Sequence, residues 1–120
     1  MASRELTLGQ TQELFASCLA SLILRLNELH YGVRMGECYR TAEQAALYAA
    51  RGIGIKNSVH CERLGADLIL SQYGEVLTRW EDYGVAGGIW KSLNLLARWG
   101  GDFERLRDGQ HFSFEYQGRA

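Results

Sequence analysis

The N-terminal third of the chain carries apolar residues at the spacing of an amphipathic helix. They recur at intervals of four, three, four and three positions, which places them on one helical stripe: Phe15, Leu19, Leu22, Leu26 and Leu29. Residues 7–10, Thr-Leu-Gly-Gln, have the form of a capping box just before the stripe. The pattern predicts a long helix that packs this stripe into the core and ends near His30, with Gly32 as its stop.

The capping signal recurs twice and predicts two further helices. Residues 41–44 precede an alanine-rich segment, and residues 78–81 precede a segment rich in tryptophan and leucine. The latter also contains glycines, each of which weakens a helix by about 1 kcal/mol relative to alanine: Gly84, Gly87 and Gly88. Two explanations stay open: the helix is broken there, or a neighbouring group packs closely against its backbone.

Short strands are predicted between and after these helices. Residues 33–39 and 67–70 carry strand-forming apolar residues, and a turn returns the chain through residues 75–77 as a hairpin. The last strand, residues 111–116, alternates clearly between aromatic and polar residues. With its aromatic face in the core, His111 points to the opposite side.

Size, charge and cysteine content narrow the classes of protein. The chain has 120 residues, no proline and no internal repeat, so we expect one domain over residues 1–120. A net charge of −1 gives no basic field for nucleic acid, and no apolar run is long enough to span a bilayer. The chain has three cysteines, Cys18, Cys38 and Cys61. Their odd number and wide spacing favour free thiols over a disulfide framework.

The candidate chemistry begins at a histidine and an aspartate seven positions apart. A glycine-punctuated loop at residues 51–57 leads to His60, and Asp67 opens a buried apolar run, where an acid is costly unless something pairs with it. His111 adds a second imidazole, and Asp108 stands three residues before it. Two histidines and one carboxylate make a three-ligand zinc site whose fourth position is left for water. A further carboxylate that is not a ligand can then move the proton of that water.

Each of these residues also has an ordinary explanation. Alone, His60 would be a loop histidine, the segment around Asp108 a turn, and Arg40 a solvated side chain at a helix start. Cys61 adjoins His60 but would point elsewhere if the backbone is extended. His30 falls in the last turn of the predicted helix, where a histidine meets the dipole favourably, and we leave it out.

Taken together, the motifs resemble a known family of zinc peptidases. Ser58-x-His60-x6-Asp67 is followed in order by Trp-Gly-Gly-Asp-Phe at residues 99–103 and by Asp108-x-x-His111-Phe. This set, with Tyr-Arg-Thr at residues 39–41, is similar to the D-Ala-D-Ala carboxypeptidase / L-alanyl-D-glutamate endopeptidase metallopeptidases. The resemblance covers roughly residues 33 to 116 and is greatest to the small single-domain phage endolysins.

The resemblance implies a fold, a metal and roles for particular residues. The expected fold is α+β, with a small antiparallel sheet that carries the zinc site and packs against helices. One zinc ion would be bound by His60, Asp67 and His111, with Asp108 as the catalytic acid or base and Arg40 at the substrate carbonyl. Four further residues of the matching motifs are assigned to substrate binding: Ser58, Trp99, Gly100 and Asp102.

The function expected from this resemblance is hydrolysis of an amide bond in peptidoglycan stem peptides, at the L-Ala to D-Glu bond. The close alternative is hydrolysis of D-Ala-D-Ala ends. The second alternative is a catalytically dead, zinc-containing binding module, as hedgehog-type relatives suggest. The acid at Asp108 favours the enzyme over the dead module. The chain departs from the commoner family pattern at Arg63 and Gly65, and its base is aspartate in place of glutamate. We expect a monomer without a signal peptide, made in the cytoplasm and released to the cell wall by a separate pore.

Overall fold

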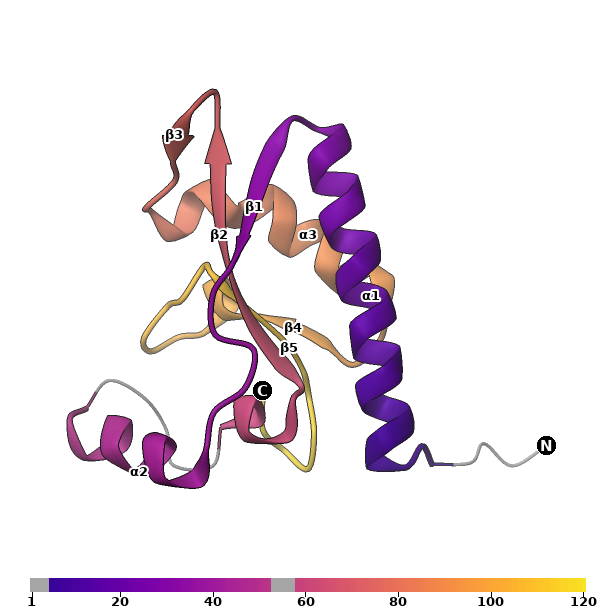
Figure 1. Cartoon of the computed structure of the whole chain (residues 1–120), viewed down its shortest axis with the longest axis vertical. Coiled ribbons are helices and arrows are strands. Elements are labelled where there is room, and N and C mark those ends of the chain that lie inside the picture. The colour runs from indigo at the N-terminus through magenta and orange to yellow at the C-terminus, as the bar shows by residue number, and fades with distance from the viewer. Residues whose placement is uncertain (1–4, 53–57) are drawn as a thin grey trace.

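The computed structural model describes residues 5–52 and 58–120, so residues 53–57 of the predicted glycine loop lie outside the described part (Figure 1). Its centre is an antiparallel sheet in the order β1-β2-β5-β4, with β3 paired to the end of β2. The strands are β1 (Tyr31–Met35), β2 (Gly65–Gln72), β3 (Glu75–Val76), β4 (Ala97–Trp99) and β5 (His111–Phe114). The α-helices are α1 (Leu8–Glu28), α2 (Ala42–Ala50) and α3 (Gly84–Leu93), and the 3-10 turns are η1 (Val59–Glu62), η2 (Trp80–Tyr83) and η3 (Gly100–Asp102).

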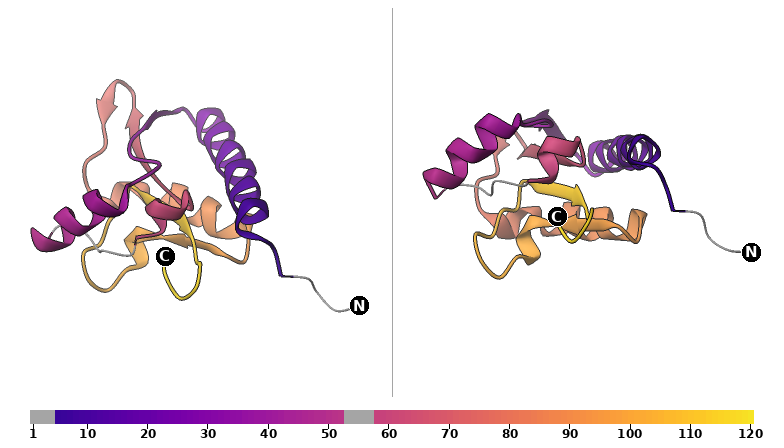
Figure 2. Two further views of the ribbon diagram at one scale, coloured as in Figure 1. Left: turned by 60° about the horizontal axis from the view of Figure 1, so that its bottom comes forward. Right: turned by 90° about the horizontal axis from the view of Figure 1, so that it is seen from below.

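One hydrophobic core joins α1, α3 and the sheet. Phe15 of α1 meets the Trp90 and Phe114 rings edge-on, with ring centroids 5.5 and 5.2 Å apart. Figures 1 and 2 show α2 lying away from this core, on the side of η1. Among the described residues no helix is long and apolar enough to cross a membrane. The predicted α+β fold, a small antiparallel sheet packed with helices, is confirmed.

Helix α1 begins as predicted but ends earlier. The capping box is present, because the Gln10 backbone N–H donates to Thr7 Oγ1 at 3.1 Å while Thr7 N–H donates to Gln10 Oε1 at 3.0 Å. The helix stops at Glu28, and His30 takes the left-handed conformation with φ 69°. Gly32 therefore belongs to β1 and is not the stop. The prediction that the buried apolar stripe extends to Leu29 is also wrong, because Leu29 is exposed.

The register between β2 and β5 separates a core face from a polar face. Ala66, Leu68, Phe112 and Phe114 are buried in the core cluster. Asp67 pairs directly with His111 in this register. Because side chains alternate along a strand, these two residues project together from the opposite face.

The segment after β1 is held against β2 although it is no longer a strand. Gly36 N–H donates to the Asp67 carbonyl at 2.7 Å, and Asp67 N–H donates to the Glu37 carbonyl at 2.8 Å. A Cβ on Gly36 would lie 2.9 Å from the Asp67 carbonyl oxygen, so only glycine allows this approach. The strand predicted to reach residue 39 ends at Met35, and the chain then carries Glu37 past Asp67.

Helix α3 is continuous despite its glycines, and the surroundings of Gly87 and Gly88 differ. The predicted cap at Thr78 is wrong: η2 begins after Arg79, whose N–H donates to the Asp82 carboxylate at 3.3 Å, and α3 follows directly. A Cβ on Gly87 would overlap the Trp99 ring, whereas one on Gly88 would meet nothing within 4 Å. Close packing against the backbone, the second of the two open explanations, therefore applies at Gly87.

We expect Gly87→Ala to destabilise the protein by about 1–3 kcal/mol, because the added methyl group overpacks the Trp99 ring. Gly88→Ala is the matched control in the same helix; it should be neutral or stabilise by up to about 1 kcal/mol. The measurement is the free energy of unfolding in denaturant. Equal effects of the two substitutions would contradict the packing assigned to Gly87.

Candidate metal centre

His60 is placed by a capped 3-10 turn. Ser58 precedes η1, and its Oγ accepts from the His60 backbone N–H at 3.2 Å. Arg63 ends the turn in the left-handed conformation, with φ 57°. Cys61 therefore lies in a 3-10 turn, and not in the extended backbone considered for it from the sequence. Its thiol still points elsewhere, lying 3.9 Å from the Thr41 carbonyl.

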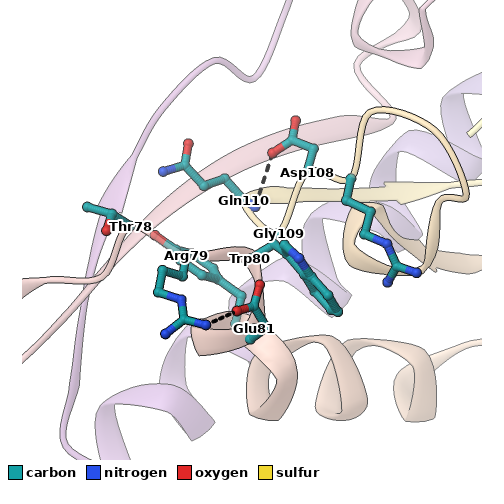
Figure 3. A pocket seen from close by; sticks show the side chains of 9 residues that line it. Thr78, Arg79, Trp80, Glu81, Asp108, Gly109 and Gln110 are labelled. Atoms are coloured by element: carbon teal, nitrogen blue, oxygen red, sulfur yellow. Dashed lines mark hydrogen bonds and ion pairs between the residues drawn. The ribbon is translucent and has the colours of Figure 1, made fainter.

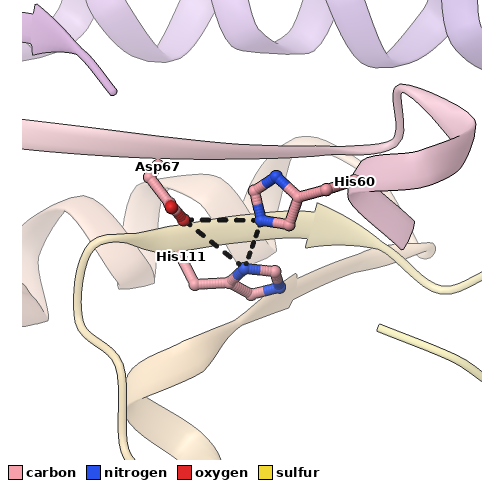
Figure 4. A group of neighbouring side chains, drawn as sticks. All are labelled: His60, Asp67 and His111. Carbon is pink, nitrogen blue, oxygen red and sulfur yellow. Dashed lines mark hydrogen bonds and ion pairs between the residues drawn. The ribbon is translucent and has the colours of Figure 1, made fainter. Parts of the chain in front are cut away.

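Three side chains from different parts of the chain converge as the sequence predicts (Figure 4). His60 Nε2 lies 3.2 Å from His111 Nδ1 and 3.5 Å from Asp67 Oδ1, and His111 Nδ1 lies 3.7 Å from the same oxygen. These atoms all lie within 4.8 Å of one another, as donor atoms around one ion would. Both histidines are buried, so the group is largely shielded from water.

The donor set fits a metal cation. Asp67 Oδ1 is buried and accepts no hydrogen bond from the residues that the structure describes. Burial raises the pKa of Asp67, but the facing His111 and His60 outweigh it and hold that pKa well below its usual range. A carboxylate oxygen and two imidazole nitrogens aimed at one point are suitable ligands for zinc, and three such ligands leave a fourth position open.

Glu37 is a member of the site that sequence reasoning missed. Its Oε1 lies 3.5 Å from His60 Nδ1, on the side of the ring that faces away from the other ligands. Arg40 binds the same oxygen through Nη2 at 2.6 Å and Nε at 2.7 Å, and Arg40 N–H donates to the His60 carbonyl at 3.1 Å. Carboxylates in this position orient ligand histidines and increase their basicity. The sequence signal was an acid three residues before Arg40, which alone resembles a surface ion pair.

Asp108 is placed by a tight contact with Gly100. Asp108 N–H donates to the Gly100 carbonyl at 3.0 Å, and His111 N–H donates to the Asp108 carbonyl at 3.1 Å. A Cβ on Gly100 would collide with that carbonyl and crowd His111. Surrounding protein atoms raise the pKa of the Asp108 carboxyl group, and the charge of Asp67 raises it further. The carboxyl group is thus a better proton acceptor than an ordinary aspartate.

The converging residues line one cavity of about 380 Å³. Six residues singled out in the sequence contribute to its wall: Arg40, Ser58, His60, Asp67, Asp108 and His111. Phe103, Arg105 and Leu106 complete one side. The three candidate ligands, one further acid and two arginines thus border the same space.

Three residues assigned to substrate binding are not brought to this cavity. Trp99 is buried and donates from Nε1 to the Gly109 carbonyl at 2.8 Å. Gly100 packs against the backbone of Asp108. Asp102 is exposed, and its Oδ2 forms an ion pair with Lys91 Nζ at 2.7 Å. Their substrate contacts remain a prediction, whereas the structure shows them supporting the loop that carries Asp108.

A second, larger hollow of about 520 Å³ borders Asp108 on its other side (Figure 3). Trp80 forms part of its wall, with the Arg107 guanidinium 4.5 Å from the ring centroid. None of the three metal-ligand candidates lines it. The three candidate ligands therefore face the smaller cavity, and Asp108 lines both.

Comparison with known proteins finds a solved structure with a similar fold. No protein-family model matches the chain, and no curated protein matches its sequence. The crystal structure of the L-Ala D-Glu endopeptidase ChiX of Serratia marcescens is similar, with a TM-score of 0.63 and 20% sequence identity. The match covers 91% of this chain and 89% of ChiX, so the fold is alike over nearly the whole of both.

We expect Glu37→Gln to weaken zinc binding by about tenfold or more, because the outer carboxylate no longer orients and polarises His60. Zinc affinity is measured by competition with a chromophoric chelator. Glu43→Gln, an exposed acid at the start of α2, is the control with the same change of charge. His60→Ala should weaken binding further, since it removes a ligand. An unchanged zinc affinity in Glu37→Gln would contradict the role assigned to Glu37.

Proposed function

We propose that this protein is a zinc-dependent peptidase that hydrolyses an amide bond in the stem peptides of peptidoglycan. The observation that carries the proposal is the convergence of His60, Asp67 and His111 in a cavity that also contains Asp108. A closed structural zinc site would need a fourth protein ligand, and none is present among the described residues. The fold shared with an L-Ala D-Glu endopeptidase supports the same choice.

The roles of the residues follow from their positions. Zinc held by the three ligands would polarise the substrate carbonyl and lower the pKa of a water molecule toward ~7. Asp108 takes a proton from the attacking water as its oxygen bonds to the carbonyl carbon. Asp108 then returns this proton to the nitrogen as the C–N bond breaks, which leaves a carboxylic acid and an amine. The raised pKa of Asp108 suits both steps.

Arg40 is proposed to contact the substrate carbonyl, as the family resemblance implies. Its guanidinium lines the cavity while two of its nitrogens are bound to Glu37. An arginine has five N–H donors in a rigid fork, so donors remain for a substrate oxygen. Glu37 holds the guanidinium in place and thereby limits its freedom to follow the substrate.

The L-Ala to D-Glu bond is the preferred substrate, because the similar structure is named for that activity. D,D-peptidase action on D-Ala-D-Ala ends is the alternative within the same chemistry. A phage endolysin, a monomer, a single domain and release to the wall by a separate pore remain predictions from the sequence. A dead binding module is disfavoured, because such a module has no need of the acid at Asp108, three residues before the candidate ligand His111.

Digestion of purified peptidoglycan followed by mass spectrometry of the muropeptides tests the proposal directly. New L-Ala and D-Glu ends, or release of terminal D-Ala, would identify the bond. Walls left intact by zinc-loaded protein would overturn the proposal.

We expect Asp108→Asn to retain its fold and zinc but to lose about 100-fold or more in kcat, because the ligands remain while the proton acceptor is gone. Turnover is measured on a soluble muropeptide, with zinc content measured on the same samples. Glu75→Gln, an exposed acid of β3 that does not line the cavity, is the control. Normal turnover by Asp108→Asn would place the base elsewhere.

Removal of the metal should abolish activity and lower thermal stability together. Zinc at 100 times its dissociation constant should stabilise the folded state by about 2.7 kcal/mol, because it binds the folded chain selectively. The measurement is the thermal midpoint of chelator-treated protein with increasing zinc, alongside activity. Full activity in a preparation that elemental analysis finds free of metal would contradict the mechanism.

A further inference from the structure

Two arginines and two aspartates line the cavity, together with Ala120. Arg40 is ion-paired with Glu37. Arg105 also lines the cavity, and no ion pair to its guanidinium is present among the described residues. The carboxylates of Asp67 and Asp108 face the same space, and metal ligation would account for the first. A positive group is therefore available to a ligand on the side of the cavity where Arg105 lies.

Arg105 belongs to a loop that is fixed on both sides. Phe103 N–H donates to the Gly100 carbonyl at 3.2 Å, and the Phe103 ring lies 5.6 Å from the His111 ring. Arg107 donates from Nη1 to the Gly101 carbonyl at 3.1 Å. Between these anchors Leu106 takes φ 51° and lines the cavity beside Arg105. The segment of residues 104–106 is thus held at the mouth of the metal site.

In the proposed reaction the leaving group would lie next to Asp108, in the cavity that Arg105 also lines. Asp108 hands a proton to the departing nitrogen, and Arg105 stands three residues before Asp108 in the same loop. In peptidoglycan the D-Glu residue is linked onward through its γ-carboxyl group, so its α-carboxylate is free. A terminal D-Ala likewise bears a free α-carboxylate. Either substrate therefore presents a carboxylate one carbon from the nitrogen that leaves.

We propose that Arg105 recognises the free α-carboxylate of the amino acid that leaves, and so selects substrates that carry one next to the cleaved bond. The inference rests on the proposed function and deepens it. The carboxylate of Asp108 would repel an anionic substrate at this position. A guanidinium with paired N–H donors matches a carboxylate in geometry and charge. Arg40 does not take this role, because Glu37 already occupies its Nε and Nη2.

The test compares acids with their amides. One pair of peptides contains L-Ala-γ-D-Glu with the α-carboxyl group either free or amidated, and a second pair ends in D-Ala-D-Ala, free or amidated. Zinc-loaded wild-type protein should cleave the acid of one pair at least about tenfold faster in kcat/KM than its amide, as expected for a charged hydrogen bond. The pair that shows the preference identifies the source of the carboxylate. Arg105→Gln should remove the preference by slowing cleavage of the acid alone.

Arg34→Gln is the matched control, since it removes the same charge at an exposed residue of β1 that does not line the metal cavity. It should retain the preference for the acid. Equal loss on acid and amide in Arg105→Gln, or a preference that survives it, would overturn the assignment.

Direct binding separates this inference from the proposed function. If wild-type protein cleaves none of the peptides, the proposed function fails, and isothermal titration with the same pairs still tests Arg105. Tighter binding of an acid that is lost in Arg105→Gln would support the inference on its own. Equal affinity for acid and amide in the wild-type protein would overturn it.

Discussion

The antiparallel register of β2 with β5 is the constraint on which the site depends. It sets Asp67 opposite His111 and turns both away from the core, while Ala66 and Phe112 are buried in it. A slip of one residue would exchange the two faces, burying a carboxylate and exposing aromatic rings. The hydrophobic pattern that holds the sheet together therefore also determines that two ligands meet. Burial of apolar surface stabilises an arrangement of polar groups that would be unfavourable without a cation.

Close backbone contacts at glycines bring the remaining groups to this pair. Gly36 lets the segment after β1 lie against the Asp67 carbonyl and so delivers Glu37 to the outer side of His60. Gly100 lets the Asp108 carbonyl approach, which places Asp108 in the loop before His111. In both cases a Cβ would separate the two segments. The precision of the site thus arises from contacts that leave no room for a side chain.

The charged side chains at the cavity fall into two groups. Glu37 and Arg40 form an ion pair next to His60, with Glu37 Oε1 3.5 Å from His60 Nδ1, so the two add no net charge there. On the opposite side Asp108 and Arg105 face the space that a substrate would occupy. Asp108 lines the same cavity as Arg105, which has no ion pair among the described residues, and this suits a reaction in which a proton moves next to an anionic group.

The sequence by itself predicted most of the helices and strands and named the three side chains that the fold brings together. Periodicity and capping depend on near neighbours, so α1, α2 and the alternating face of β5 were predictable, and the convergence of His60, Asp67 and His111 was expected from the motifs. Only the tertiary structure showed which other residues contact or support these side chains. Glu37 reaches His60 through a backbone contact with Asp67, and Gly87 faces the ring of Trp99, which is buried and away from the cavity. Such contacts join segments distant in the chain, and their geometry follows from packing, which leaves no periodic trace in the sequence.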